Sequence, residues 1–277
     1  AQDTGMDFIG PYTFCAVRLF LGFLGLLPFF IYFEFNEIKN INFNLKKVFF
    51  FTLILGSIFG MANILQQVSL LYTDIANSAV FTVLYVVIVP LISYFIFSIK
   101  IHPSIWPSVT LCLIGGLLLS EIKNYDVRFG DMLVIIGAFF WAFHIIFIYK
   151  VLKIFNFPIA IATFQCLVAG IFCSFPALAF ETVTINLISK EITELLYAGI
   201  LSSGVAFMLQ AYAQRVLSPA SVAIIFSLEG VFASIFGWIL LDQFLSEIKV
   251  FGIMIILLAV IFSQLIPIYG KKNYGRI

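Results

Sequence analysis

Nine apolar runs of about 20 residues, separated by short polar connections, constrain this chain more than any other feature of its sequence. An apolar helix of that length spans the hydrocarbon core of a bilayer, and the connections leave no room for a soluble domain. The sequence therefore predicts an all-α polytopic membrane protein with nine transmembrane helices, over residues 12–35, 48–72, 75–98, 104–120, 131–152, 158–179, 195–216, 219–241 and 247–268.

Composition narrows the possible classes of function. The 277 residues are 62% hydrophobic and only 10% charged, whereas a soluble domain carries about 25% charged residues. This excludes a soluble enzyme, a nucleic-acid binder and a disordered protein. All four cysteines lie inside apolar runs without zinc spacing, which predicts no disulfide, no metal and no cofactor. The sequence also lacks nucleotide-binding and hydrolase motifs, so we expect neither ATP-driven transport nor an enzyme.

Basic residues predict how the chain is oriented, because Lys and Arg are enriched in cytoplasmic loops. One set of alternate connections, with the C-terminus, holds Lys39, Lys46, Lys47, Lys100, Lys150, Lys153, Arg215, Lys271, Lys272 and Arg276. The other set holds only Lys123, Arg128, Lys190 and Lys249. We therefore expect a multi-pass protein of the plasma membrane, in a bacterium the inner membrane, with a cytoplasmic C-terminus.

A weak internal repeat relates the two halves of the chain. A shift of 144 residues aligns Gly60 with Gly204, Gln66 with Gln210 and Tyr85 with Glu229. A shift of 147 residues aligns Pro11 with Pro158. The second half holds five apolar runs and the first half four, so we expect a first helix to be missing from this chain. Repeats of five helices, an odd number, insert with opposite topology, as in many secondary transporters.

Several motifs, in order along the chain, resemble the EamA family of the drug/metabolite transporter superfamily. They are Ile9–Phe14 with Ala16 and Arg18, Leu84–Leu91, Gly130–Leu133 with Phe140–His144, Ser203–Phe207 with Gln210 and Ala213–Arg215, and Ser227–Ala233 with Trp238. Gly230 stands where the family usually has Pro. The resemblance implies an inverted-repeat 5+5 fold of ten helices. Its first repeat covers residues 1–125, with the first helix absent, and its second covers residues 126–277.

The resemblance also implies a function, that of a secondary transporter. Members of the family commonly export amino acids or similar small metabolites, by alternating access at a midplane site. The implied partners are a small-molecule substrate, protons as a candidate coupling ion and the lipid bilayer, with no nucleic acid. The protein would be a monomer or a homodimer. The missing helix keeps an alternative open, a non-transporting membrane scaffold or remnant carrier.

Glu229 is the sharpest candidate for a substrate-binding residue, because it lies near the middle of an apolar run. A carboxylate there costs about 2.5–3.5 kcal/mol on insertion scales. It must therefore be protonated, paired or exposed to a wet cavity. Glu229 would contact a substrate amine or couple protons, or it would form a structural hydrogen bond between helices.

The predicted substrate site also includes His144, Trp141, Gln66, Gln210, Tyr85 and Asn63. His144 would relay protons, or its ring would bond a backbone carbonyl. The three amides would line the cavity or pack between helices. Tyr85, as the repeat partner of Glu229, would line the cavity opposite it.

A second group of residues is predicted to act in gating or in helix packing: Pro90, Gly56, Gly60, Gly230 and Arg18. Pro90 would kink its helix. Gly56 and Gly60, four residues apart, would let two helices approach closely. Arg18 would extend to the membrane interface or contact an anion.

Overall fold

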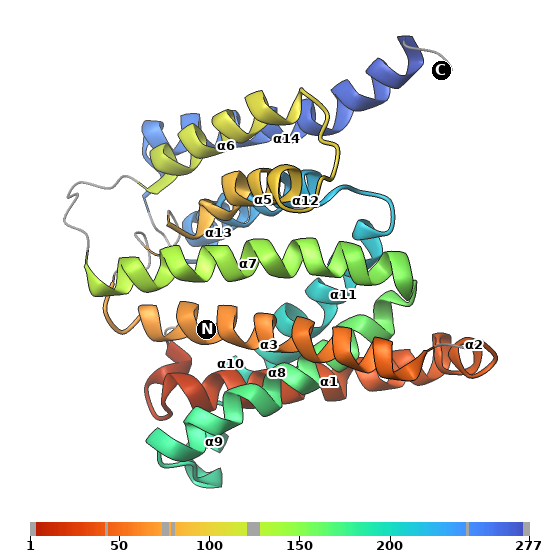
Figure 1. Ribbon diagram of the computed structural model, residues 1–277. Coiled ribbons are helices and arrows are strands. Elements are labelled where there is room, and N and C mark those ends of the chain that lie inside the picture. The colour runs from red at the N-terminus through yellow and green to blue at the C-terminus, as the bar shows by residue number, and fades with distance from the viewer. Residues whose placement is uncertain are drawn as a thin grey trace. The chain divides into compact units, whose positions relative to one another are not determined.

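The computed structural model describes residues 4–41, 44–73, 78, 81–120, 128–241 and 244–273 of the chain. Within these ranges all regular secondary structure is helical (Figure 1), which confirms the predicted all-α class. Seven helical segments of the described ranges are long and apolar enough to cross a membrane. They are Pro11–Phe33, Leu45–Ser69, Phe129–Ile154, Pro158–Phe180, Ile192–Gln214, Pro219–Ile239 and Glu247–Leu265.

Two further apolar helices of the described ranges, Phe81–Phe95 and Ile105–Leu119, are shorter than these spans. Each of the nine predicted runs overlaps one of the long or short helices. The predicted number of nine membrane crossings is nevertheless not confirmed, because the two shorter helices fall below the usual spanning length of about 20 residues.

The helices form two compact units, each built from two separate stretches of the chain. Unit 1 comprises residues 1–71 and 146–216, and unit 2 comprises residues 72–145 and 217–277. The boundary at residue 146 falls inside one helix, α7 (Phe129–Ile154). Each unit therefore takes helices from both halves of the sequence. The proposed repeats stay a prediction, since a compact unit and a sequence repeat are different divisions of the same chain.

Unit 1 is organised around α8 (Pro158–Phe180), which packs lengthwise on α1 (Pro11–Phe33) and on α3 (Leu45–Ser69). Proline is the first residue of both α1 and α8, where its fixed φ suits a helix start and its missing N–H is not needed. The shorter helices of this unit are η1 (Thr4–Met6), α2 (Phe35–Lys39) and α9 (Ile185–Lys190).

The span Ile192–Gln214 of unit 1 is not a uniform α-helix. α10 (Ile192–Leu196) continues into a π-helical segment, η2 (Tyr197–Val205), and then into α11 (Ala206–Gln214). Small residues bring α1 close to this segment, because a Cβ added to Gly22 would lie 3.0 Å from the carbonyl oxygen of Gly199. A π segment widens the helix, and such segments are frequent at functional sites.

Unit 2 pairs α6 (Ile105–Ser120) with α14 (Glu247–Asn273), which lie side by side in Figure 1. It also pairs α5 (Tyr85–Phe95) with α12 (Pro219–Phe226), and α13 (Leu228–Leu241) follows α12 directly. The Ser218 hydroxyl caps α12 by accepting a hydrogen bond from the backbone N–H of Ser221 at 3.2 Å.

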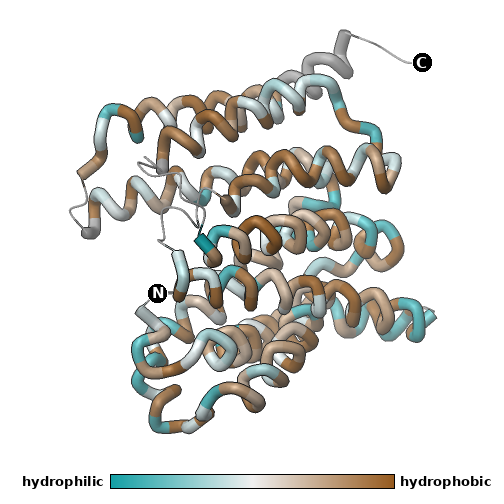
Figure 2. Tube along the Cα trace, turned by 60° about the vertical axis from the view of Figure 1, so that its left-hand side comes forward, coloured by the Kyte–Doolittle hydropathy of each residue, from teal (hydrophilic) through white to brown (hydrophobic). Residues whose placement is uncertain are grey.

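Apolar side chains cover much of the outer surface of the helices. Figure 2 shows hydrophobic residues along the helices and hydrophilic residues gathered mainly near their ends and connections. Phe50, Phe175 and Phe251 are among the large apolar side chains that lie exposed. Exposed apolar surface of this extent is unfavourable in water and favourable against lipid tails. The surface is therefore that of a membrane protein.

Candidate functional site

Each of two spans in unit 2 contains one turn that is wound more tightly than an α-helix. A predicted site residue follows each of these turns. The backbone N–H of Leu84 donates to the carbonyl three residues back at 3.2 Å, and the N–H of Ser227 does the same at 3.2 Å. Such a turn interrupts an α-helix and often marks a functional hinge or a strained position. Tyr85 begins α5 directly after the first turn. Glu229 is the second residue of α13 after the other.

Tyr85 interacts electrostatically with Glu229 and with the Cys112 thiol of α6. Cys112 Sγ lies 3.3 Å from Ser227 Oγ, which ties α6 to the tightened turn before Glu229. Tyr85 is buried whereas Glu229 is exposed, although it stands at the centre of the span Pro219–Ile239. An exposed mid-span carboxylate is available to bind a cation or a proton. The structure thus brings two predicted residues together and adds Cys112 and Ser227.

His144 and Trp141 lie on α7 in unit 2. Their rings meet edge to face, with centroids 5.8 Å apart, and His144 is fully buried.

Pro90 is buried within α5, which continues beyond it to Phe95. A Cβ added to Gly230 would lie 3.1 Å from Leu119 Cδ2, so α13 is close to α6 at this residue.

Arg18 lies inside unit 1, where it is only 2% exposed and does not extend to an interface. Its Nη2 donates a hydrogen bond to Asn63 Oδ1, and its guanidinium lies 5.6 Å from the ring centroid of Phe14. Asn63 Nδ2 donates in turn to the carbonyl of Phe59 at 2.7 Å. The Nε atom of Arg18 has no hydrogen-bond partner among the described residues. Arg18 and Asn63 therefore join α1 to α3 by a buried polar contact.

The remaining predicted residues of unit 1 lie on α3 and α11. Gln66 is half-buried, and Gln210 Nε2 donates to Gln214 Oε1 at 3.1 Å. Gly56 and Gly60 face α8 closely, because a Cβ added to Gly56 would lie 2.5 Å from Val168 Cβ. The predicted site residues thus divide between the units, with Arg18, Gly56, Gly60, Asn63, Gln66 and Gln210 in unit 1 and Tyr85, Pro90, Trp141, His144, Glu229 and Gly230 in unit 2.

Two glutamates that the sequence analysis missed bind helix N-termini in unit 1. Glu181 accepts hydrogen bonds from the backbone N–H groups of Tyr12 at 3.0 Å and Thr13 at 2.7 Å, and from the Thr13 hydroxyl at 2.6 Å. Glu34 accepts hydrogen bonds from the backbone N–H groups of Ile159 and Ala160, the second and third residues of α8, at 3.0 and 2.7 Å. These N–H groups have no partner within their own helix, and a carboxylate also complements the positive end of the helix dipole.

The environment of Glu34 disfavours its charged form. Burial raises the pKa of this carboxyl above its ordinary value of 4.5. The backbone hydrogen bonds from Ala160 and Ile159, and the nearby guanidinium of Arg215, offset that effect only in part. The side chain is 6% exposed. Glu34 therefore makes strong hydrogen bonds at a place where a carboxylate is costly to bury.

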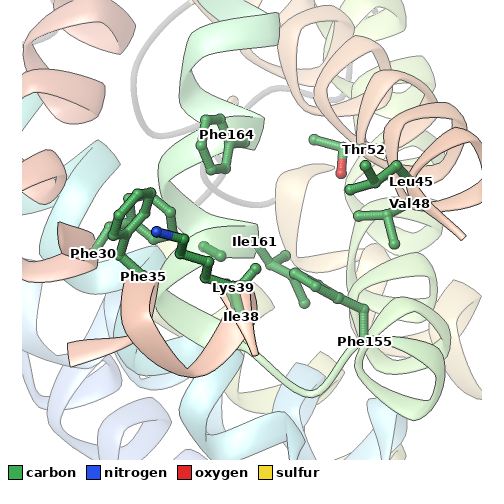
Figure 3. A pocket seen from close by; sticks show the side chains of 11 residues that line it. Phe30, Phe35, Ile38, Lys39, Leu45, Val48, Thr52, Phe155, Ile161 and Phe164 are labelled. Carbon is green, nitrogen blue, oxygen red and sulfur yellow. The ribbon is translucent and has the colours of Figure 1, made fainter. Parts of the chain in front are cut away.

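A cavity of about 350 Å³ lies in unit 1 next to the N-terminus of α8. Figure 3 shows its lining, which is aromatic and aliphatic apart from the ammonium group of Lys39 and the hydroxyl of Thr52. Its aromatic residues are Phe30, Phe35, Phe155 and Phe164. A site for a hydrophilic solute needs several convergent polar groups. This cavity therefore does not have the lining of a site for a small polar metabolite.

The described residues hold no group of three or more His, Cys, Asp or Glu side chains that could bind a metal ion. The four cysteines, Cys15, Cys112, Cys166 and Cys173, are buried and free.

Known proteins resemble this chain over nearly its whole length. The EamA-like transporter family matches residues 1–121 and 128–265. An uncharacterized transporter of Archaeoglobus fulgidus is 30% identical over 264 residues, which are 94% of this chain and 79% of the relative. A protein of known crystal structure superimposes with a TM-score of 0.77 at 13% identity, over 95% of this chain and 91% of the other. That last likeness shows a shared fold.

Proposed function

Because the chain belongs to the EamA-like transporter family and is a membrane transporter rather than an enzyme, we propose that it moves amino acids or similar small metabolites by alternating access. The tightened turns before Tyr85 and Glu229 carry this proposal. In many secondary transporters, interrupted helices hold the substrate and the coupling ion near the membrane midplane. Here each interruption is followed by a polar side chain, and the two side chains interact.

We assign the central role to Glu229. An exposed carboxylate in mid-span can hold a substrate ammonium group through charge-assisted hydrogen bonds, and it can exchange that group for a coupling proton. Tyr85 is proposed to contribute its hydroxyl, His144 to relay protons, and Trp141 to contact the substrate. Gln66, Gln210 and Asn63 stay proposed substrate-binding residues of unit 1. Pro90, Gly56, Gly60, Gly230 and Arg18 are proposed to support gating and packing.

The proposed direction of transport is export across the plasma membrane, in a bacterium the inner membrane. The excess of Lys and Arg in one set of connections supports a cytoplasmic C-terminus. The transporter is proposed to work as a monomer or a homodimer within the bilayer.

A ligand screen on the purified protein tests the proposed substrate class. The thermal midpoint of the wild type is measured with each common amino acid, and the variants Glu229→Gln and Glu247→Gln are measured in parallel. Glu247 is a matched control because it is an exposed carboxylate at the start of α14.

We expect at least one amino acid to raise the midpoint of the wild type and of Glu247→Gln equally, because a ligand that binds only the folded state stabilises it. The same amino acid should leave Glu229→Gln unchanged. If every amino acid leaves the wild type unchanged, the substrate class is wrong. If Glu229→Gln responds like the wild type, the role of Glu229 is wrong.

A further inference from the structure

Each of the helices α1 and α8 is followed by a glutamate that binds the N-terminus of the other helix. α1 and α8 each have 23 residues, each begins with proline, and each is followed directly by a glutamate. Glu181, which follows α8, binds the N-terminus of α1, and Glu34, which follows α1, binds the N-terminus of α8. The shift of 147 residues that aligns the two prolines also aligns the two glutamates. Both ends of one antiparallel helix pair are therefore joined in the same way.

At the N-terminus of α1, the Glu181 carboxylate fits only because a glycine stands there. Gly10 is the N-cap residue of α1, and a Cβ added there would lie 2.2 Å from Glu181 Cδ. No heavy atom can occupy that position without moving the glutamate. The aromatic rings of Tyr12 and Phe180 pack beside this contact, with centroids 6.3 Å apart. The geometry is thus built for a glutamate that comes from the end of α8.

Contacts between the two helices continue along their length. α1 and α8 make the most extensive helix–helix contact of the described residues. Phe30 and Phe164 meet edge to face at 5.1 Å, near the Glu34 end. Towards the other end, the thiols of Cys15 on α1 and Cys173 on α8 are neighbours. Each donates to a carbonyl of α3, Cys15 to Asn63 at 3.5 Å and Cys173 to Gly60 at 3.8 Å. No described segment separates the helices between their ends.

Separation of the pair at either end would leave a carboxylate and two backbone N–H groups without these partners. Both groups would then lie in or near a bilayer, where unsatisfied backbone groups are costly. In an inverted repeat, helix contacts that open alternately on the two sides of the protein are open on one side and closed on the other in any one state. The two ends of this pair are instead closed in the same structure.

We propose that Glu34 and Glu181 are positioning residues that make α1 and α8 one rigid pair, and that the pair does not separate during the transport cycle. This inference rests on the proposed transport function, because it says which helices stay together while others move. The sulfur atoms of Cys15 and Cys173 provide a direct test of it, since they can be joined covalently without any substitution.

In the test, the wild-type protein in proteoliposomes is treated with molecular iodine, which oxidises the two thiols to a disulfide and is itself reduced to two iodide ions, with loss of two protons. Mass spectrometry of the digested protein identifies the Cys15–Cys173 disulfide. Uptake of a mixture of radiolabelled amino acids is measured before oxidation, after oxidation and after reduction. The control is Cys173→Ala, treated in the same way, which cannot form this bond.

A rigid pair predicts that the oxidised wild type keeps its transport rate within about twofold of the untreated protein. Loss of transport on oxidation, restored by reduction and absent in Cys173→Ala, would show that the helices must separate and would overturn the proposal. Failure of the disulfide to form, despite reactive thiols, would also contradict the contact between the helices.

Amide hydrogen exchange tests the same proposal without any transport, so its outcome is independent of the proposed function. In lipid nanodiscs, the N–H groups of Tyr12 and Thr13 and those of Ile159 and Ala160 should exchange slowly. Glu181→Gln should speed exchange at least tenfold at the start of α1 only, and Glu34→Gln should do so at the start of α8 only. Equally fast exchange at these amides in the wild type would show that the ends open freely.

Discussion

At the scale of single residues, the contact between Gly10 and Glu181 shows how a backbone position can depend on a residue 171 positions away. Gly10 is replaceable only if the carboxylate moves, and the carboxylate accepts three hydrogen bonds that would then be lost. The two residues should therefore be energetically coupled.

We expect Gly10→Ala to destabilise the folded protein by about 1–3 kcal/mol, the usual cost of a buried group that loses its hydrogen bonds. In the background of Glu181→Ala, the same substitution should cost much less, because no carboxylate remains to be displaced. Unfolding of the four proteins in detergent measures this cycle. Additive effects would show that the two sites are independent.

Glu34 should make the stability of the protein depend on pH. Its pKa in the folded state is raised above 4.5 by burial, so the folded protein holds the proton to a higher pH than the unfolded chain. Its contribution is therefore greatest below the unfolded pKa and declines as pH rises through the folded pKa. Thermal midpoints of the wild type and Glu34→Gln are measured from about pH 4 to pH 8, and the midpoint of the wild type relative to the variant should fall as pH rises. A relative midpoint that rises with pH would contradict the raised pKa.

The sequence contained a signal for these glutamates that the sequence analysis did not use. The 147-residue shift that aligns Pro11 with Pro158 at the start of the apolar runs also aligns Glu34 with Glu181 at their ends. Their partners could not be read from the sequence, because each glutamate binds backbone N–H groups of a distant helix. Every residue except proline has a backbone N–H group, so the residue type does not show which of these groups binds a glutamate.

At the scale of helices, the contact between α6 and α14 depends on two glycines. A Cβ added to Gly115 would lie 2.6 Å from Ile256 Cγ1 and 2.9 Å from the carbonyl oxygen of Gly252. Gly116, one residue later, is a matched control, because a Cβ there would make an ordinary contact of 3.4 Å with Val83 Cγ1.

We expect Gly115→Ala to lower the free energy of unfolding by about 1–3 kcal/mol, the typical cost of overpacking. Gly116→Ala should have little effect or be slightly stabilising, since alanine favours a helix more than glycine does. Thermal denaturation in detergent compares the two variants. Equal destabilisation by both would mean that close approach of α6 to α14 is not what Gly115 provides.

Helix boundaries were largely predictable, because long apolar runs and the prolines at 158 and 219 mark them clearly. Irregularities within helices were not. Examples are the π-helical segment Tyr197–Val205 and the tightened turns at Leu84 and Ser227. The periodicity of an almost uniformly apolar run carries little information about such local changes.

At the scale of the whole molecule, the sequence predicted the membrane class and the family, and both are confirmed. Glu229 was predicted as a carboxylate in the middle of an apolar run and Tyr85 as its repeat partner, and the two interact electrostatically. Their role in transport stays a prediction. The composition of the compact units was not predicted. Each unit draws on both halves of the chain, because helices distant in sequence pack more closely than many neighbours.

Solute flux through the purified protein tests the account most directly. Proteoliposomes that contain the wild type, Glu229→Gln or Glu247→Gln are loaded with a mixture of unlabelled amino acids, and exchange for labelled amino acids is followed with and without a pH gradient. The account predicts pH-dependent exchange by the wild type and by Glu247→Gln, and loss of that exchange or of its pH dependence in Glu229→Gln. Exchange no faster than in protein-free liposomes, for every amino acid tested, would contradict it.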